Sequence, residues 1–140
     1  MIVVDASIMA KLYRDEPGSE EAQALIAAKA GQMLAPDIFA IEVAGVIVRD
    51  ANSDKLAIAL QREKLAHLEL LLASPVLQLV GTRSADIVNA AKLAIELGHP
   101  LKDCLYLALA IDHSCDLLTA DMRFAARARN VWNQVQVLGE

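Results

Sequence analysis

Four acidic residues stand where their carboxylates could share a metal ion. Asp5 directly follows a short apolar run, and Asp121 comes two residues after a second run that ends at Thr119. Asp103 is expected in the first turn of a helix, where the positive end of the helix dipole favours an anion. Glu42 emerges from the apolar stripe of a helical segment, with no Lys or Arg three or four residues away. Because an unpaired buried carboxylate is costly, the partner of Glu42 must be distant in the sequence.

Three of the four acids have an ordinary structural explanation when each is taken alone. Asp103 and Asp121 are typical of helix starts and turns, and Asp5 is typical of a loop before a helix. Four converging carboxylates, however, would repel one another by about 4 kcal/mol per close pair at an effective dielectric constant of about 20. One or two divalent cations would relieve that repulsion, and oxygen-only ligands favour Mg²⁺ or Mn²⁺ over zinc or copper. Two such ions could activate water and stabilise the leaving oxygen of a phosphodiester.

These acids need a scaffold that gathers strand ends, and the hydrophobic patterns provide one. Short apolar runs predict strands at Ile2 to Val4, Met33 to Ala35, Val76 to Val80, Leu117 to Thr119 and Val135 to Leu138. Helical spacing and capping residues predict helices that begin near Ile8 with Ser7 as cap, and over Ser19 to Gly31, Asp37 to Ala51, Asp54 to Ser74, Ser84 to Gly98 and from Asp103 onward. This alternation predicts an α/β fold with a mostly parallel sheet of about five strands and helices on both faces.

The size and composition are those of one domain, spanning residues 1–140. The apolar content of 56% is high for a free monomer. Much of the excess lies in Ala- and Leu-rich helical segments, including a leucine stripe in the segment from Asp54 to Ser74, that could face a partner protein. The net charge of −5 argues against binding nucleic acid by bulk charge. If four of the 18 acids hold metal, 14 acids remain against 13 bases, so a phosphodiester substrate stays compatible with the composition.

The two cysteines, Cys104 and Cys115, lie in or beside one expected helix and are three turns apart, too far to bridge easily. No Cys/His spacing indicates zinc, and no paired base marks either thiol as a nucleophile. Isolated thiols are typical of a reducing compartment. The sequence also lacks an apolar run of about 20 residues and the basic start of a secretion signal, so we expect a cytoplasmic protein.

Four segments of the chain carry a pattern found in a known family. They are Ile2-Val3-Val4-Asp5-Ala6-Ser7, then Pro36 followed six residues later by Glu42, then Asp103-Cys104-Leu105-Tyr106-Leu107-Ala108-Leu109-Ala110, and finally Leu117-Leu118-Thr119-Ala120-Asp121. In this order the segments resemble those of PIN-domain ribonucleases of the VapC kind, the toxins of bacterial type II VapBC toxin-antitoxin pairs. The resemblance covers nearly the whole chain, which also has the usual length of that family.

The resemblance implies a fold and an activity. The fold would be a PIN-like three-layer sandwich with the first strand central. The activity would be a Mg²⁺- or Mn²⁺-dependent endoribonuclease with one or two ions, whose metal-binding and catalytic residues are Asp5, Glu42, Asp103 and Asp121. The hydroxyls of Ser7 and Thr119 would lie near the metal or its waters. The implied partners are an RNA substrate, a VapB-like antitoxin that covers an apolar groove and blocks the acidic site, and a second copy in a homodimer.

One position departs from the family pattern. Three residues after the helical Glu the family often has Asn, and this sequence has Gly45. A glycine inside a helix costs up to about 1 kcal/mol relative to alanine, so it indicates close packing or room near the site. Asp112 and Asp116, near the fourth strand, are weaker candidates for metal contact.

Basic residues near the same strand ends are candidates for binding the RNA phosphates. Arg123 and Arg127 are four residues apart beyond Asp121, and Lys11 and Arg14 are three residues apart beyond Ser7, so each pair can share a helix face. Lys102, beside Asp103, is a further candidate. Because aromatic residues are few, recognition would depend on phosphates and RNA shape rather than on base stacking.

Two alternatives use the same residues differently. A PIN-like domain with weak catalysis could act as a binding or regulatory module through a partner protein, although the complete set of four acids argues against this. A receiver- or phosphatase-type α/β domain also gathers aspartates at strand ends. Such sites need a second acid close to the first, whereas this sequence reads Asp5-Ala6-Ser7.

Overall fold

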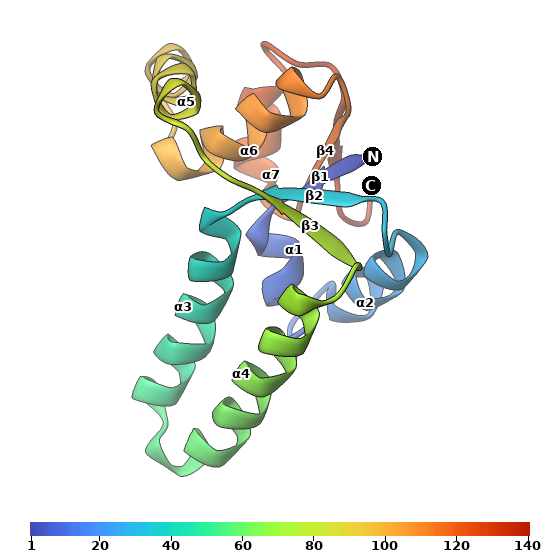
Figure 1. The fold of residues 1–140 in the computed structure, drawn as a ribbon, viewed down its shortest axis with the longest axis vertical. Coiled ribbons are helices and arrows are strands. Elements are labelled where there is room, and N and C mark those ends of the chain that lie inside the picture. Colours follow the sequence, from blue (N-terminus) through green and yellow to red (C-terminus); the bar gives the residue numbers. More distant parts are fainter.

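A five-stranded parallel sheet forms the centre of the computed structural model, which describes all 140 residues (Figure 1). The strand order is β3-β2-β1-β4-β5, so the first strand is central, as the resemblance implied. All four neighbouring pairs are parallel. The strands are β1 (Ile2–Val4), β2 (Met33–Pro36), β3 (Leu77–Val80), β4 (Asp116–Thr119) and β5 (Val135–Val137). All five strands predicted from the apolar runs are therefore confirmed.

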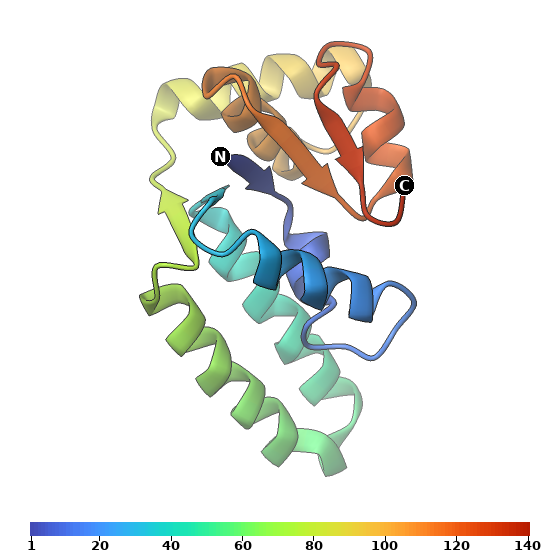
Figure 2. The same ribbon diagram turned by 90° about the vertical axis from the view of Figure 1, so that its right-hand side faces the viewer.

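Seven α-helices cover the two faces of this sheet. They are α1 (Ala6–Ala10), α2 (Ser19–Ala28), α3 (Ile38–Ser53), α4 (Ile58–Ala73), α5 (Ser84–Leu97), α6 (Leu101–Asp112) and α7 (Met122–Ala128), with a short 3-10 helix at Lys55–Ala57. Figures 1 and 2 show α5, α6 and α7 on one side of the sheet and α1 to α4 on the other. The predicted three-layer α/β architecture is confirmed.

Two predicted helix caps are wrong. Ser7 lies inside the first turn of α1 and not before it, because Asp5 takes the capping position. Ser84 is likewise the first residue of α5, where Arg83 precedes the helix and its backbone N–H donates to the Asp86 carboxylate at 2.8 Å. At α1 the Ser7 hydroxyl donates to the Asp5 carboxylate instead of capping the helix. At α5 the Asp86 carboxylate accepts the N–H of Arg83, which precedes the helix in the place expected for Ser84.

The core lies on both sides of β1 and β4. A cluster of 27 buried residues joins the strands to α1, α3, α6 and α7. Its largest fully buried side chains include Phe39, Tyr106 and Phe124. Burial on both faces explains why these strands read as continuous apolar runs in the sequence. The strand ends that carry Asp5 and Thr119 are thus anchored in the most densely packed part of the molecule.

Helices α3 and α4 form a hairpin that extends away from the sheet (Figure 1). Of the leucine stripe expected between Asp54 and Ser74, only Leu68 is buried, so the rest of the chain leaves most of this stripe uncovered. Leu56, Leu60 and Leu65 are exposed, Leu56 to 98%. The hairpin therefore presents apolar side chains to solvent beyond what the core requires. No helix of the protein has the length and apolarity needed to span a bilayer.

Candidate active site

The site is built first around Asp5, at the carboxyl end of the central strand. Strands β1 and β4 are parallel neighbours, with Val4 opposite Leu118, so Asp5 comes to lie beside Thr119 although 114 residues separate them. Asp5 Oδ2 accepts hydrogen bonds from Thr119 Oγ1 at 2.7 Å and from Ser7 Oγ at 2.8 Å. The side chain is buried, and both hydroxyls hold the same carboxylate oxygen. The other oxygen, Oδ1, is left for a different partner.

The same two hydroxyls organise the turn that follows β4. Ser7 Oγ accepts a hydrogen bond from the backbone N–H of Ala120 at 3.0 Å, and Thr119 Oγ1 accepts one from the backbone N–H of Asp121 at 3.0 Å. Asp121 then begins α7, and its Oδ1 accepts from the Phe124 N–H at 2.9 Å. The helix-start explanation for Asp121 is therefore correct, and it does not exclude a ligand role, since one carboxylate oxygen remains unused.

The distant partner expected for Glu42 is Tyr106. The Tyr106 hydroxyl donates to Glu42 Oε1 at 2.8 Å, across 64 residues of sequence and from α6 to α3. Tyr106 is fully buried and lies one turn after Asp103 on the same face of α6. The sequence analysis included Tyr106 in the family-like segment from Asp103 to Ala110 but gave it no role at the site. The signal that could have found it is a tyrosine in an apolar helix, whose hydroxyl needs a partner when it is buried.

His99 is a further residue that sequence reasoning missed. One ligand atom from each of His99, Asp103 and Asp121 lies within 4.8 Å of the others. His99 Nε2 is 2.6 Å from Asp103 Oδ2. The available signal was its spacing, since His99 comes four residues before Asp103, between Gly98 and Pro100 at the bend into α6.

Burial and mutual repulsion control the charges of the acids. Burial, and to a lesser extent the charges of Asp103 and Glu42, raise the pKa of Asp5 to about 6, although the hydrogen bonds from Thr119 and Ser7 oppose the shift. Burial also raises the pKa of Glu42, and the charge of Asp103 acts in the same direction. Both shifts come mainly from removing the carboxylates from water, and neighbouring negative charge adds to them.

The donor set of this site fits a divalent cation. None of the four acids pairs with a Lys or Arg side chain, and Asp103 alone has a histidine, His99, within hydrogen-bond distance. The remaining carboxylates are held by hydroxyl groups and backbone N–H groups, which orient oxygen atoms without neutralising them. Closely spaced carboxylate oxygens with excess negative charge are the ligands that Mg²⁺ and Mn²⁺ prefer.

The candidate phosphate-binding residues fall into two groups. Three are engaged within the protein: Lys11 with Glu16 and the Pro17 carbonyl, Arg14 with Asp50, and Arg127 with the Gly98 carbonyl and His99. Lys102 and Arg123 are exposed and form no ion pair. The charge of Lys102 reaches Glu42, whose pKa it lowers. Of the five candidate residues, only Lys102 and Arg123 are therefore left exposed without an ion pair.

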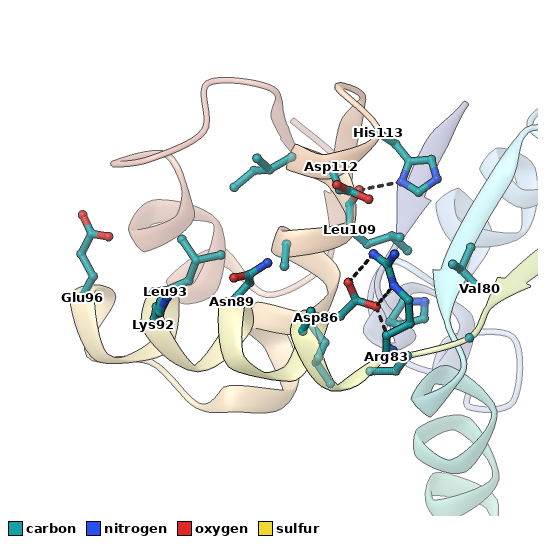
Figure 3. A pocket seen from close by; sticks show the side chains of 17 residues that line it. Val80, Arg83, Asp86, Asn89, Lys92, Leu93, Glu96, Leu109, Asp112 and His113 are labelled. Atoms are coloured by element: carbon teal, nitrogen blue, oxygen red, sulfur yellow. Dashed lines mark hydrogen bonds and ion pairs between the residues drawn. The ribbon is translucent and has the colours of Figure 1, made fainter.

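A hollow lies on the face of α6 that points away from the acidic site (Figure 3). Its volume is about 680 Å³, and α6 contributes Leu105, Ala108 and Leu109 to its wall. These positions recur at helical spacing on the side of α6 away from Asp103 and Tyr106. None of the four acids lines this hollow, so it is separate from the candidate active site.

The weaker acidic candidates lie outside the acidic site. Asp112 is exposed at the carboxyl end of α6 and lines the hollow on the far face of that helix. Asp116 begins β4 opposite Ile2, at the amino ends of these strands and so away from Asp5, and it accepts a hydrogen bond from Gln136. At Gly45, an added Cβ would meet only Arg49 Nη1 at 3.9 Å, so the glycine marks room and not close packing.

Comparison with known proteins identifies the family. Residues 2–130 match the PIN domain family. The chain belongs to the PIN domain family. No curated protein sequence shows significant similarity to it. Membership overturns the receiver- or phosphatase-type alternative, and the observed strand order also differs from the 2-1-3-4-5 order of receiver domains.

Several solved structures share this PIN fold at low sequence identity. PAE2754 from Pyrobaculum aerophilum superposes with a TM-score of 0.70 at 16% identity, covering 90% of this chain and 83% of that one. A toxin-antitoxin complex from Klebsiella pneumoniae gives 0.68 at 17% identity, covering 100% and 99%. VapC20 of Mycobacterium tuberculosis, a toxin that cleaves the sarcin-ricin loop, gives 0.70 at 18% identity, covering 90% and 94%. These likenesses establish the fold.

Proposed function

We propose that this PIN domain is a divalent-metal-dependent endoribonuclease that hydrolyses RNA phosphodiester bonds. The observation that carries the proposal is the Asp5 carboxylate, which is buried at the end of the central strand without a basic partner, is reached by the charges of Asp103 and Glu42, and has its pKa raised to about 6. A buried carboxylate that no basic side chain neutralises is typical of a site that binds a cation. Membership of the PIN family supports the same reading.

Each acid in this proposal is oriented by a different neighbour. Ser7 and Thr119 hold one oxygen of Asp5, Tyr106 holds Glu42, and Asp121 keeps one oxygen free while the other begins α7. We assign Asp5, Glu42, Asp103 and Asp121 as the residues that would hold one or two Mg²⁺ or Mn²⁺ ions. The chemistry supplied by such ions is activation of water and stabilisation of charge on the leaving oxygen.

No protein nucleophile is needed for this hydrolysis. Cys104 directly follows Asp103, but it is fully buried and burial raises its pKa to about 11, so its thiolate is not available at neutral pH. Lys102 and Arg123 would bind phosphates of the RNA on either side of the acids. Both are exposed, Lys102 directly before Asp103 and Arg123 two residues after Asp121, so a flexible strand can reach them.

In the cell, we propose that this nuclease acts as the toxin of a bacterial toxin-antitoxin pair. The resemblance to VapC toxins and the shared fold with the Klebsiella pneumoniae complex support it. The exposed leucines of the α3-α4 hairpin offer apolar surface for an antitoxin or a second copy in a homodimer. Free thiols at Cys104 and Cys115 agree with the cytoplasm, where such pairs act on RNA.

The nuclease is tested by four conservative substitutions. Asp5→Asn, Glu42→Gln, Asp103→Asn and Asp121→Asn each remove charge but little volume, and each should strongly reduce Mn²⁺-dependent cleavage of an RNA substrate while leaving the circular dichroism spectrum unchanged. Asp121→Asn should reduce cleavage least, because the sequence pattern around Asp121 constrains this residue less than the patterns around the other three acids. Asp112→Asn is the matched control and should cleave at the wild-type rate. Full activity in Asp5→Asn or Asp103→Asn would exclude the proposed site.

The toxin role is tested separately in growing bacteria. Induced expression of the wild-type protein should halt growth, and Asp103→Asn should abolish this effect at equal protein level. A wild-type protein that is soluble, free of antitoxin and active on RNA, yet never slows growth, would leave the enzyme intact and exclude the toxin.

A further inference from the structure

His99 contacts the acidic site from outside the set of four acids. Its imidazole Nε2 lies 2.6 Å from Asp103 Oδ2, and only 5% of its side chain is exposed. The ring stacks on Phe124 of α7, with centroids 4.8 Å apart and planes inclined by 20°. Packing therefore fixes the ring plane, so the direction from which Nε2 approaches Asp103 is fixed as well.

The partners of the imidazole determine which of its nitrogens carries hydrogen. Arg127 Nη1 lies 3.4 Å from His99 Nδ1, and a guanidinium has only hydrogens to offer. Nδ1 must accept, and the hydrogen is then on Nε2, which donates it to Asp103 Oδ2. Arg127 is itself held by the Gly98 carbonyl, directly before His99. A chain of donors thus runs from Arg127 through His99 to one oxygen of Asp103.

We infer that His99 is a positioning residue for the metal site. It holds Oδ2 of Asp103, so that the other carboxylate oxygen stays free for a cation that Asp121, whose ligand atom lies within 4.8 Å, could share. An Nε2 atom that donates its hydrogen has no lone pair for a metal, so His99 acts through Asp103 and not as a ligand. The inference rests on the proposed metal-dependent function and adds a residue to it. Partners of this kind typically change metal affinity by about 10- to 100-fold when they are removed.

Two substitutions at His99 separate the hydrogen bond from the packing. His99→Phe keeps a ring to stack on Phe124 but removes the donor to Asp103. His99→Gln keeps an amide N–H in the same region. His113→Phe is the matched control, because His113 is exposed at the opposite end of α6.

The measurement is Mn²⁺ affinity of the full-length protein, from free Mn²⁺ by electron paramagnetic resonance, without RNA or turnover. His99→Phe should raise the dissociation constant by about 10-fold or more, and His99→Gln should stay within about threefold of wild type. His113→Phe should match wild type. If His99→Phe does not fold, as judged by circular dichroism, Arg127→Leu replaces it and should weaken Mn²⁺ binding severalfold, because Nδ1 loses its donor.

A double variant shows whether His99 acts through Asp103. If it does, His99→Phe combined with Asp103→Asn should bind Mn²⁺ no more weakly than Asp103→Asn alone. A further loss of affinity in the double variant would make His99 a direct ligand and overturn the positioning role. Wild-type affinity in His99→Phe would overturn it too, while the metal site would stand. A wild-type protein that binds no Mn²⁺ would overturn both this inference and the proposed function.

Discussion

Without metal, Asp5 should make the protein less stable at neutral than at mildly acidic pH. Burial is the main reason that its folded-state pKa is raised from 3.8 to about 6, with repulsion from Asp103 and Glu42 adding to it. The ionised form is therefore disfavoured in the folded protein relative to the unfolded chain. A difference of roughly two pKa units corresponds to about 3 kcal/mol of unfolding free energy once Asp5 is fully ionised.

The direction of the pH dependence follows from the raised value. The contribution of Asp5 is fully present below its unfolded pKa and is lost as the pH rises through about 6. Glu42, whose pKa is also raised, acts in the same direction. Acids with a lowered pKa, such as Asp86 at about 2, act in the opposite direction but only below their unfolded pKa. Between pH values of about 5 and 7.5, the slope due to carboxyl groups therefore comes from the buried acids.

Asp5→Asn is the variant that isolates this effect. Its amide oxygen can still accept from Ser7 and Thr119, but the side chain does not ionise. In chelator, urea unfolding followed by circular dichroism should show wild type losing stability with rising pH and Asp5→Asn losing less. At a pH of about 7.5 the variant should be more stable by about 2 to 3 kcal/mol. Groups common to both proteins, including the three histidines, cancel in the difference.

Metal should narrow this difference in stability. Mn²⁺ at about 100 times its dissociation constant should add about 2.7 kcal/mol to wild type, and it should add less to Asp5→Asn. Asp86→Asn, which alters the ion pair with Arg83 and the start of α5 but none of the four acids, should follow wild type in the metal response and in the pH slope between about 5 and 7.5. Equal pH slopes in wild type and Asp5→Asn would refute the argument that buried, uncompensated charge marks this site.

Two further substitutions test neighbours of the acids. Tyr106→Phe removes the donor to Glu42 Oε1 and should cost about 1 to 2 kcal/mol in urea unfolding at neutral pH, together with a slower rate of RNA cleavage; an unchanged rate would mean that Glu42 needs no such support. Gly45→Ala should raise stability by up to about 1 kcal/mol, seen as a higher melting temperature, because the added Cβ meets only the end of Arg49. A lower melting temperature would show that α3 requires the glycine.

The strands and their order of appearance could be predicted from the sequence because the sheet is covered on both faces. Under those conditions a parallel strand is a short continuous apolar run, such as Ile2–Val4, and such runs are visible without any knowledge of the fold. Asp5 and Asp121 were found for the same reason, since each directly follows or nearly follows a run. At α4 the leucine spacing indicates an apolar face but does not show whether anything covers it, and the structure leaves most of that face exposed.

The contacts that orient the acids were decided only by the tertiary structure. Thr119 reaches Asp5 because β1 and β4 are neighbours in the sheet, and Tyr106 reaches Glu42 because α6 and α3 meet at its edge. Both pairs are separated by 64 residues or more, so no local spacing encodes them. Even His99, only four residues from Asp103, is fixed by its stacking on Phe124 of a later helix. Local sequence thus places single carboxylates at strand and helix ends, whereas the packing of distant elements gives each one its partner, its burial and its pKa.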